Sequence, residues 1–114
     1  MLKKTNSIGR KKEFLEIKNK GNILNSPLFG AVTLQDDTED LKFGFVISKK
    51  ISKRAVDRNK IKRRMSEVLV KNLKKFKLGT KIVFLAKKNL LRASIEEIEE
   101  EINRIILKTK PTSG

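Results

Sequence analysis

The 114-residue sequence contains no cysteine, histidine, tryptophan or tyrosine, and its six glycines are scattered. Without cysteine, the chain has neither a disulfide framework nor a thiolate metal site. It also lacks histidine, the commonest general base, and the thiol nucleophile. No glycine-rich loop is present to hold a phosphate group. These absences argue against protein-based catalysis and favour a protein that acts by binding.

Long hydrophobic runs are also missing. No apolar segment approaches the ~20 residues that a membrane-spanning helix needs, and the N-terminal MLKKTNSIGRKKEF lacks the hydrophobic stretch of a secretory signal. We therefore expect a cytoplasmic protein that forms a single domain over residues 1–114, with a flexible arm over 1–9 and a disordered tail over 109–114.

Acidic residues are scarce relative to basic ones. The chain has 28 Lys and Arg against 13 Asp and Glu, which gives a formal charge of +15 and a pI near 10.3. Charge on that scale repels itself, so a polyanionic partner is its natural explanation. Nucleic acid is the first candidate, an anionic membrane surface is the second, and a merely solubilising charge is the third.

Hydrophobic periodicity predicts a helix, two strands, a helix, a strand and a final helix. The strand–helix–strand run over 41–86 implies a parallel pair within a mixed sheet. The fold class is therefore α/β (α+β), a two-layer sandwich with helices packed on a mixed central sheet. The expected elements are a helix over 10–20, strands over 27–34 and 41–48, a helix from 55 or 56 to about 73, a strand over 80–86, a helix after Ser94 and a further short strand near 22–24.

Local signals support these assignments. Ser94 followed three residues later by Glu97 is a capping box. The polar QDDTED connector between the first two long strands has the length of a hairpin loop. Apolar stripes predict the inward-facing residues, which are Phe14, Ile17 and Leu15 in the first helix, Ile61, Met65, Val68 and Leu69 in the second, and Ile95, Ile98, Ile102, Ile105 and Ile106 in the last.

A dense basic cluster precedes and enters the second helix. Nine of the sixteen residues from Lys49 to Arg64 are Lys or Arg, and only Asp57 opposes them. Such groups neutralise phosphates, and arginine adds forked contacts to phosphate oxygens. Structured RNA, which is read mainly by shape and backbone, suits this ridge. A solvated helix face and a membrane surface remain the alternatives.

Two other features have competing interpretations. Asp36, Asp37 and Asp40 of the connector could hold magnesium or calcium, or serve a protein nuclease, but they lack calcium-loop spacing and we favour an ordinary turn. Phe14 could stack on a base, with Lys12, Lys18 and Lys42 nearby to follow a nucleic-acid backbone, or it could be ordinary core.

The stretch AVDRNKIKRRMSE resembles the RNR motif of the protein component of bacterial ribonuclease P. The lead-in Ser48, Lys49 and Lys50 also matches, and KKEFLEIKNKG and LGTKIVFLAKKNLLRASIEEIEEEI resemble the family's first helix and its last strand, loop and helix. The sequence departs from the family pattern at four positions. Lys60 and Ser66 stand where arginine is common, and Lys18 and Val32 stand where an aromatic residue is often found.

The resemblance implies a fold with a left-handed crossover between its parallel strands. It also implies a subunit of an endonuclease that removes the 5′ leader from precursor tRNA, with an active site on the catalytic RNA. Magnesium would be held mainly by that RNA, and the protein alone would bind no metal tightly. The protein would also bind neither a membrane nor a small-molecule substrate. The implied contacts to the catalytic RNA are Arg58, Asn59, Lys60, Lys62 and Arg63, supported by Lys49, Lys50, Lys53, Arg54 and Arg64; those to the leader are Phe14, Lys12 and Lys18.

One further alternative remains open beside this resemblance. A generic structured-RNA binder, such as a ribosomal or RNA-chaperone protein, would carry a similar basic surface. It would bind many RNAs alike and would not activate a catalytic RNA.

Overall fold

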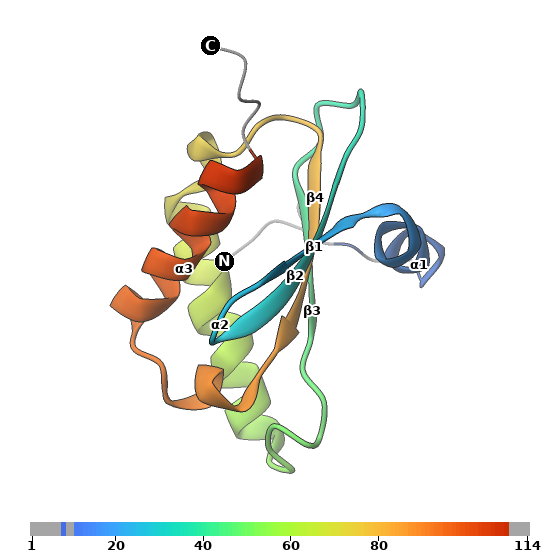
Figure 1. Ribbon diagram of the computed structural model, residues 1–114. Helices are drawn as coiled ribbons and strands as arrows, with labels where there is room; N and C mark the ends of the chain where they lie inside the picture. Colours follow the sequence, from blue (N-terminus) through green and yellow to red (C-terminus); the bar gives the residue numbers. More distant parts are fainter. Residues whose placement is uncertain (1–7, 9–10, 110–114) are drawn as a thin grey trace.

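The computed structural model describes residue 8 and residues 11–109 (Figure 1). The expected arm and tail lie outside this part of the chain except for Ile8 and Thr109. All the expected helices and strands are present, with boundaries shifted by a few residues. They are α1 (Lys11–Lys20), β1 (Asn22–Asn25), β2 (Phe29–Gln35), β3 (Lys42–Val46), α2 (Ala55–Lys71), β4 (Thr80–Ala86) and α3 (Ile95–Thr109), with short 3₁₀ helices η2 (Leu73–Lys75) and η3 (Lys88–Arg92).

The four strands form one mixed sheet in the order β1-β2-β4-β3. β3 and β4 are parallel, as predicted, and α2 forms the crossover between them. β2 and β3 do not pair despite their hairpin-length connector, because β4 lies between them and pairs antiparallel with β2. The connector therefore crosses the end of a strand rather than closing a hairpin. The handedness of the crossover stays a prediction.

The main core lies between the sheet and the pair α2 and α3, which cover one face (Figure 1). The predicted stripe of α2 is buried, and so are Ile98, Ile102, Ile105 and Ile106 of α3. Aromatic rings fill the space against the sheet, where Phe84 contacts Phe29 at 5.2 Å and Phe45 at 5.8 Å between ring centroids. Five of the six phenylalanines belong to this core, and Phe14 is the exception.

α1 covers part of the opposite sheet face and adds a partial third layer (Figure 1). Ile17 is buried there against Val32 and Val83. Leu15 was expected to point inward, but its side chain is 48% exposed. The short amphipathic helix has room for only a narrow apolar stripe, and Leu15 lies about 200° from Ile17 around the helix.

Side chains fix the ends of the two long helices. The Ser94 Oγ accepts a hydrogen bond from the Glu97 N–H, and a Glu97 carboxylate oxygen accepts one from the Ser94 N–H, which confirms the capping box. α2 ends at Asn72, whose buried side chain donates to the Val68 carbonyl and to Glu99 of α3. This Asn72 contact lowers the pKa of Glu99, and Lys71 adds to the effect.

Candidate nucleic-acid interface

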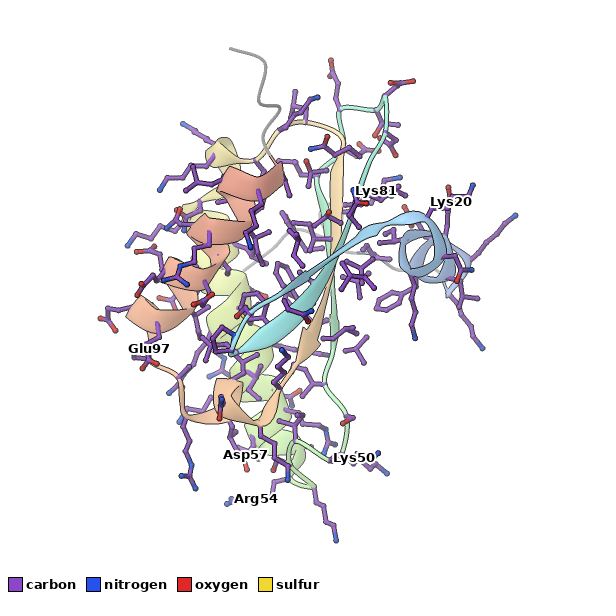
Figure 2. All side chains as sticks on the ribbon, viewed as in Figure 1. Lys20, Lys50, Arg54, Asp57, Lys81 and Glu97 are labelled. Atoms are coloured by element: carbon purple, nitrogen blue, oxygen red, sulfur yellow. The ribbon has the colours of Figure 1, made fainter. Side chains whose placement is uncertain are left out.

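The basic cluster lies at one end of the molecule, where β3 runs into the loop before α2 (Figure 2). We call the exposed cations of this loop and of the outer face of α2 the basic ridge. Among the residues that the structure describes, none of the ridge side chains forms an ion pair or a side-chain hydrogen bond. The ridge comprises Lys49, Lys50, Lys53, Arg54, Lys60, Lys62 and Arg63, with the exposed Asn59 among them.

Ser52 gives the loop of the ridge a defined shape. Its hydroxyl donates to the Asp57 carboxylate at 2.9 Å and accepts from the Arg54 backbone N–H at 3.2 Å. The Arg58 guanidinium donates to the Ser52 carbonyl at 2.8 Å. Asp57, the one acid in the cluster, therefore organises the start of α2. Arg58 is half-buried and uses one donor internally, which leaves the rest of its five N–H groups for a ligand.

The structure separates Arg64 from the other predicted RNA-binding residues. Its guanidinium donates to the Ala93 carbonyl at 3.0 Å and so links α2 to the segment before α3. Helical geometry explains this, because Arg64 follows Arg63 by 100° and turns toward the core side. Arg64 therefore has a structural bond, whereas Lys60 and Arg63 face solvent.

Sequence reasoning missed cations on η3. A depression of about 420 Å³ lies between the loop and η3, lined by Lys50, Ile51, Lys88, Asn89, Leu91 and Arg92. Its cations extend the basic surface beyond α2. The signal available in the sequence was the Lys87–Lys88 pair directly after the last strand, which brings charge to the same sheet end as Ser48.

A second surface lies on the sheet face that α1 partly covers. Because side chains alternate along a strand and paired residues share a face, Val46, Leu85, Asn25 and Ile23 all lie on this face. Val46 is 38% exposed and Ile23 is 69% exposed. We call these four residues the exposed strip; within it Leu85 is half-buried and packs against the cluster of Ile17, Val32 and Val83. On β3 and β4 the strip lies at the strand C-terminal ends, which lead toward the basic ridge and η3.

Phe14 and Lys18 share one side of α1, since residues four apart lie on the same helical face. The half-buried Phe14 ring lies over Gly44, where an added Cβ would be 2.8 Å from Phe14 Cε2. Lys12 does not join them. It lies with Glu13, Glu16 and Lys42 around a hollow of about 440 Å³. Of the three predicted leader-binding residues, the structure brings two together.

An ion-pair chain holds the other side of α1 to the sheet. Lys42 Nζ lies 2.9 Å from Glu13 Oε1, so Lys42 is not free to follow a nucleic-acid backbone. Lys81 Nζ lies 3.8 Å from the same Glu13 oxygen and 2.7 Å from Asp36 Oδ2. The Lys81 contact and a Thr38 hydrogen bond lower the pKa of Asp36 to about 2. Asp36 in turn raises the pKa of Lys81.

The acidic connector forms an ordinary turn, as favoured. Asp36 Oδ1 accepts from the Thr38 N–H and hydroxyl, and the Gly79 N–H donates to the Asp40 carbonyl. Within residues 8 and 11–109, no three acidic side chains come together as metal ligands. In the same part of the chain, no helix is both long and apolar enough to cross a bilayer.

The fold and these surfaces define a small mixed α/β protein with a preformed, unpaired cationic ridge, the character of a nucleic-acid-binding subunit. The family model for ribonuclease P matches residues 2–110. The ribonuclease P protein component of a Nitratiruptor species is 32% identical over 109 residues, covering 96% of each chain. The RNase P protein of Staphylococcus aureus is 26% identical with a TM-score of 0.79, covering 94% of this chain and 97% of that one. The Thermotoga maritima protein shares the fold, with a TM-score of 0.82 at 22% identity, over 92% of this chain and 98% of that one.

The chain belongs to the ribonuclease P protein family. It is a protein subunit of the ribonuclease P holoenzyme, an endoribonuclease of tRNA processing, and an RNA is its partner in that holoenzyme. The predicted family and fold class are thereby confirmed. The residue roles and the cytoplasmic location stay predictions.

Proposed function

We propose that this subunit binds the catalytic RNA through the basic ridge and the 5′ leader of precursor tRNA through the exposed strip beside α1. The ridge supplies Lys60, Lys62 and Arg63 as direct phosphate contacts, with Arg58 and Asn59 at the start of the helix. The strip joins Phe14 and Lys18 as the leader surface. Magnesium ions would act at the RNA, and the ridge would raise their effective affinity by relieving phosphate repulsion.

The observation that carries this proposal is the lack of internal partners along the ridge. Elsewhere on the described part of the chain, several lysines are paired with acids, including Lys42, Lys81 and Lys71. Within the described residues, the ridge cations of α2, which are Lys60, Lys62 and Arg63, are left unpaired at the cost of mutual repulsion. A polyanion that released its counterions on binding would offset that cost. The hydrogen bonds around Ser52 support this, because they define the backbone of the loop that carries the cations and so reduce the cost of ordering it on binding.

The shape of the strip supports a single-stranded ligand with weak sequence preference. Phe14 is the only phenylalanine outside the main core, and Val32 is buried beneath α1. Base stacking is therefore restricted to one ring, and the remaining contacts would be apolar or made to the backbone. Stacking on a single ring tolerates every base, because each has a π-face. We expect the leader's length to matter more than its sequence.

Cleavage of a precursor tRNA with a 5′ leader tests the proposal. A bacterial ribonuclease P RNA at limiting magnesium should gain activity when the protein is added, whereas the protein alone should cleave nothing. A ridge variant with Lys60, Lys62 and Arg63 all changed to Gln should lose most of that gain. The matched control changes the exposed Lys74, Lys77 and Lys108 to Gln, which removes the same charge away from the ridge.

Three results would contradict the proposal. Equal losses in the ridge and control variants would mean that only net charge matters, as for a generic RNA binder. Salt-sensitive binding to RNA without any gain in cleavage would likewise indicate a generic RNA binder. Cleavage by the protein alone would place an active site on the protein.

A further inference from the structure

We propose that Glu13 is a positioning residue that, through Lys42 and Lys81, holds α1 away from the exposed strip and so keeps the leader surface open. The inference rests on the proposed function for its role in leader binding. Its structural basis is the unequal attachment of the two sides of α1.

The ion pairs attach α1 at one end of the parallel strands. Lys42 and Lys81 are register partners near the N-terminal ends of β3 and β4. The same two strands present Val46 and Leu85 four residues further on, at their C-terminal ends and on the same face. Glu13 therefore ties the helix to the end of the sheet opposite to the strip, and Figure 2 shows Lys81 at the end away from Lys50 and Arg54.

The chain of charges is well suited to fix a position. Glu13, Lys42 and Lys81 have side chains that are 20%, 25% and 16% exposed, so solvent screens them less than it screens the surface pair of Lys20 and Glu16. Two lysines paired side by side in a sheet repel each other unless an acid lies between them. Glu13 is that acid, and Asp36 holds Lys81 from the other side.

The hydrophobic effect opposes the position that the Glu13 ion pairs give to α1. Val46 and Ile23 leave apolar surface open on the face that α1 already covers in part. Burial of that surface is favourable, so an unanchored α1 gains by moving across the strip. The C-terminal end of α1 joins β1 through Gly21, whose N–H donates to the Ile17 carbonyl. Between that end and the ion pairs, Ile17 and the Phe14 ring over Gly44 hold α1 to the strands. Both are apolar contacts, which are non-directional and permit sliding.

The first test compares Glu13→Gln with Glu16→Gln in the reconstituted holoenzyme. Both variants remove one negative charge from α1, but Glu16 is 53% exposed, its ion pair within the described residues is with Lys20 at 4.0 Å, and its charge acts on Lys81 less than that of Glu13 does. The measurement is the ratio of Kd for leaderless tRNA to Kd for leader-bearing precursor. We expect Glu13→Gln to reduce this ratio about fivefold, equivalent to about 1 kcal/mol of positioning free energy. Glu16→Gln should leave it unchanged, and kcat at saturating precursor should be equal in both.

The second test needs no RNA and uses the absence of cysteine in the chain. A Val46→Cys substitution creates a single thiol on the strip, and its alkylation rate reports whether α1 covers it. Adding Glu13→Gln should slow alkylation about fivefold, whereas adding Glu16→Gln should not. Lys42→Gln should have the same effect as Glu13→Gln, and combining the two should add little, as expected for residues that act as a unit.

The outcomes separate the two proposals. A wild-type holoenzyme that does not distinguish leader-bearing from leaderless tRNA overturns leader binding, and the alkylation rates then decide the position of α1 alone. A wild-type leader effect that Glu13→Gln leaves intact, with unchanged alkylation, overturns the positioning role and leaves leader binding standing.

Discussion

Replacing Asp36 with asparagine should cost about 1 kcal/mol of stability at neutral pH and almost nothing near pH 2. The Asp36 carboxylate lies 2.7 Å from Lys81 Nζ and has a pKa of about 2, against 3.8 for an unperturbed group. At about 1.4 kcal/mol per pH unit, this difference sets an upper limit of about 2.5 kcal/mol. The side chain is 30% exposed, and solvent screening reduces the limit to about 1 kcal/mol.

The direction of the pH dependence follows from the lowered pKa. A carboxyl group whose pKa is lower in the folded state stabilises the fold above its unfolded pKa. That contribution is lost as the pH falls from about 4 through about 2 and the carboxylate takes up a proton. Asparagine keeps the oxygen that accepts from the Thr38 N–H at 3.0 Å, so the substitution removes the ion pair while keeping the turn.

The assay is urea unfolding followed by far-UV circular dichroism from pH 7 to pH 2 at low salt. Urea is uncharged and does not screen the pair, and the chain has no tryptophan or tyrosine to report by fluorescence. Asp37→Asn is the matched control, because Asp37 is exposed and forms no ion pair in the described part of the chain. A stability difference between wild type and Asp36→Asn that does not change with pH would refute the reasoning, as would an equal effect of Asp37→Asn.

Three further substitutions test the ridge, the turn and the core. Arg63→Gln should lower the slope of log K against log salt for RNA binding by about 1, the loss of one phosphate contact, measured by filter binding from low to moderate salt. Gly79→Ala should destabilise the protein by about 2–4 kcal/mol in the same urea titration, because Gly79 has φ +89° and a Cβ there would lie 2.8 Å from the Thr38 carbonyl oxygen. The control Gly30→Ala should lower the free energy of unfolding far less, because a Cβ at Gly30 has only ordinary contacts at 3.8 Å or more. Ile102→Ala should cost about 2–5 kcal/mol, since the side chain is fully buried, whereas Leu107→Ala at 71% exposure should shift the urea midpoint little.

Sequence periodicity predicted the elements whose signals are local. The stripe that begins at Ile61 and the Ser94 cap depend on residues three or four positions apart, and both are confirmed. Leu15 was misplaced, because a ten-residue helix offers too few apolar positions to define its inward face. The strand order could not be predicted from the sequence, for a different reason. Pairing of β4 with β2 and β3 joins residues that are several tens of positions apart, and periodicity carries no information about such partners.

In the candidate site, too, the sequence predicted the local features and not the contacts that depend on the fold. Charge density alone located the ridge, because nine cations in one short stretch are visible in the sequence. The internal bonds of Arg58 and Arg64 depend on carbonyl groups that only the folded loop brings close. The chain of charges around Glu13 joins α1, β3, β4 and the connector after β2, and it has no signature along the sequence.

The position of β4 between β2 and β3 has a consequence for synthesis on the ribosome. Both outer partners leave the ribosome well before β4, so Phe29 and Phe43 have no completed sheet to enter until residues 80–86 are made. The nascent chain therefore carries its polycationic segment while still unfolded, in an environment rich in RNA. The four-stranded sheet is complete only when this late central strand pairs with both of its neighbours, and contacts over such long separations form slowly. A cell that makes this protein gains from keeping the unfinished chain off the RNAs around it until that strand has arrived.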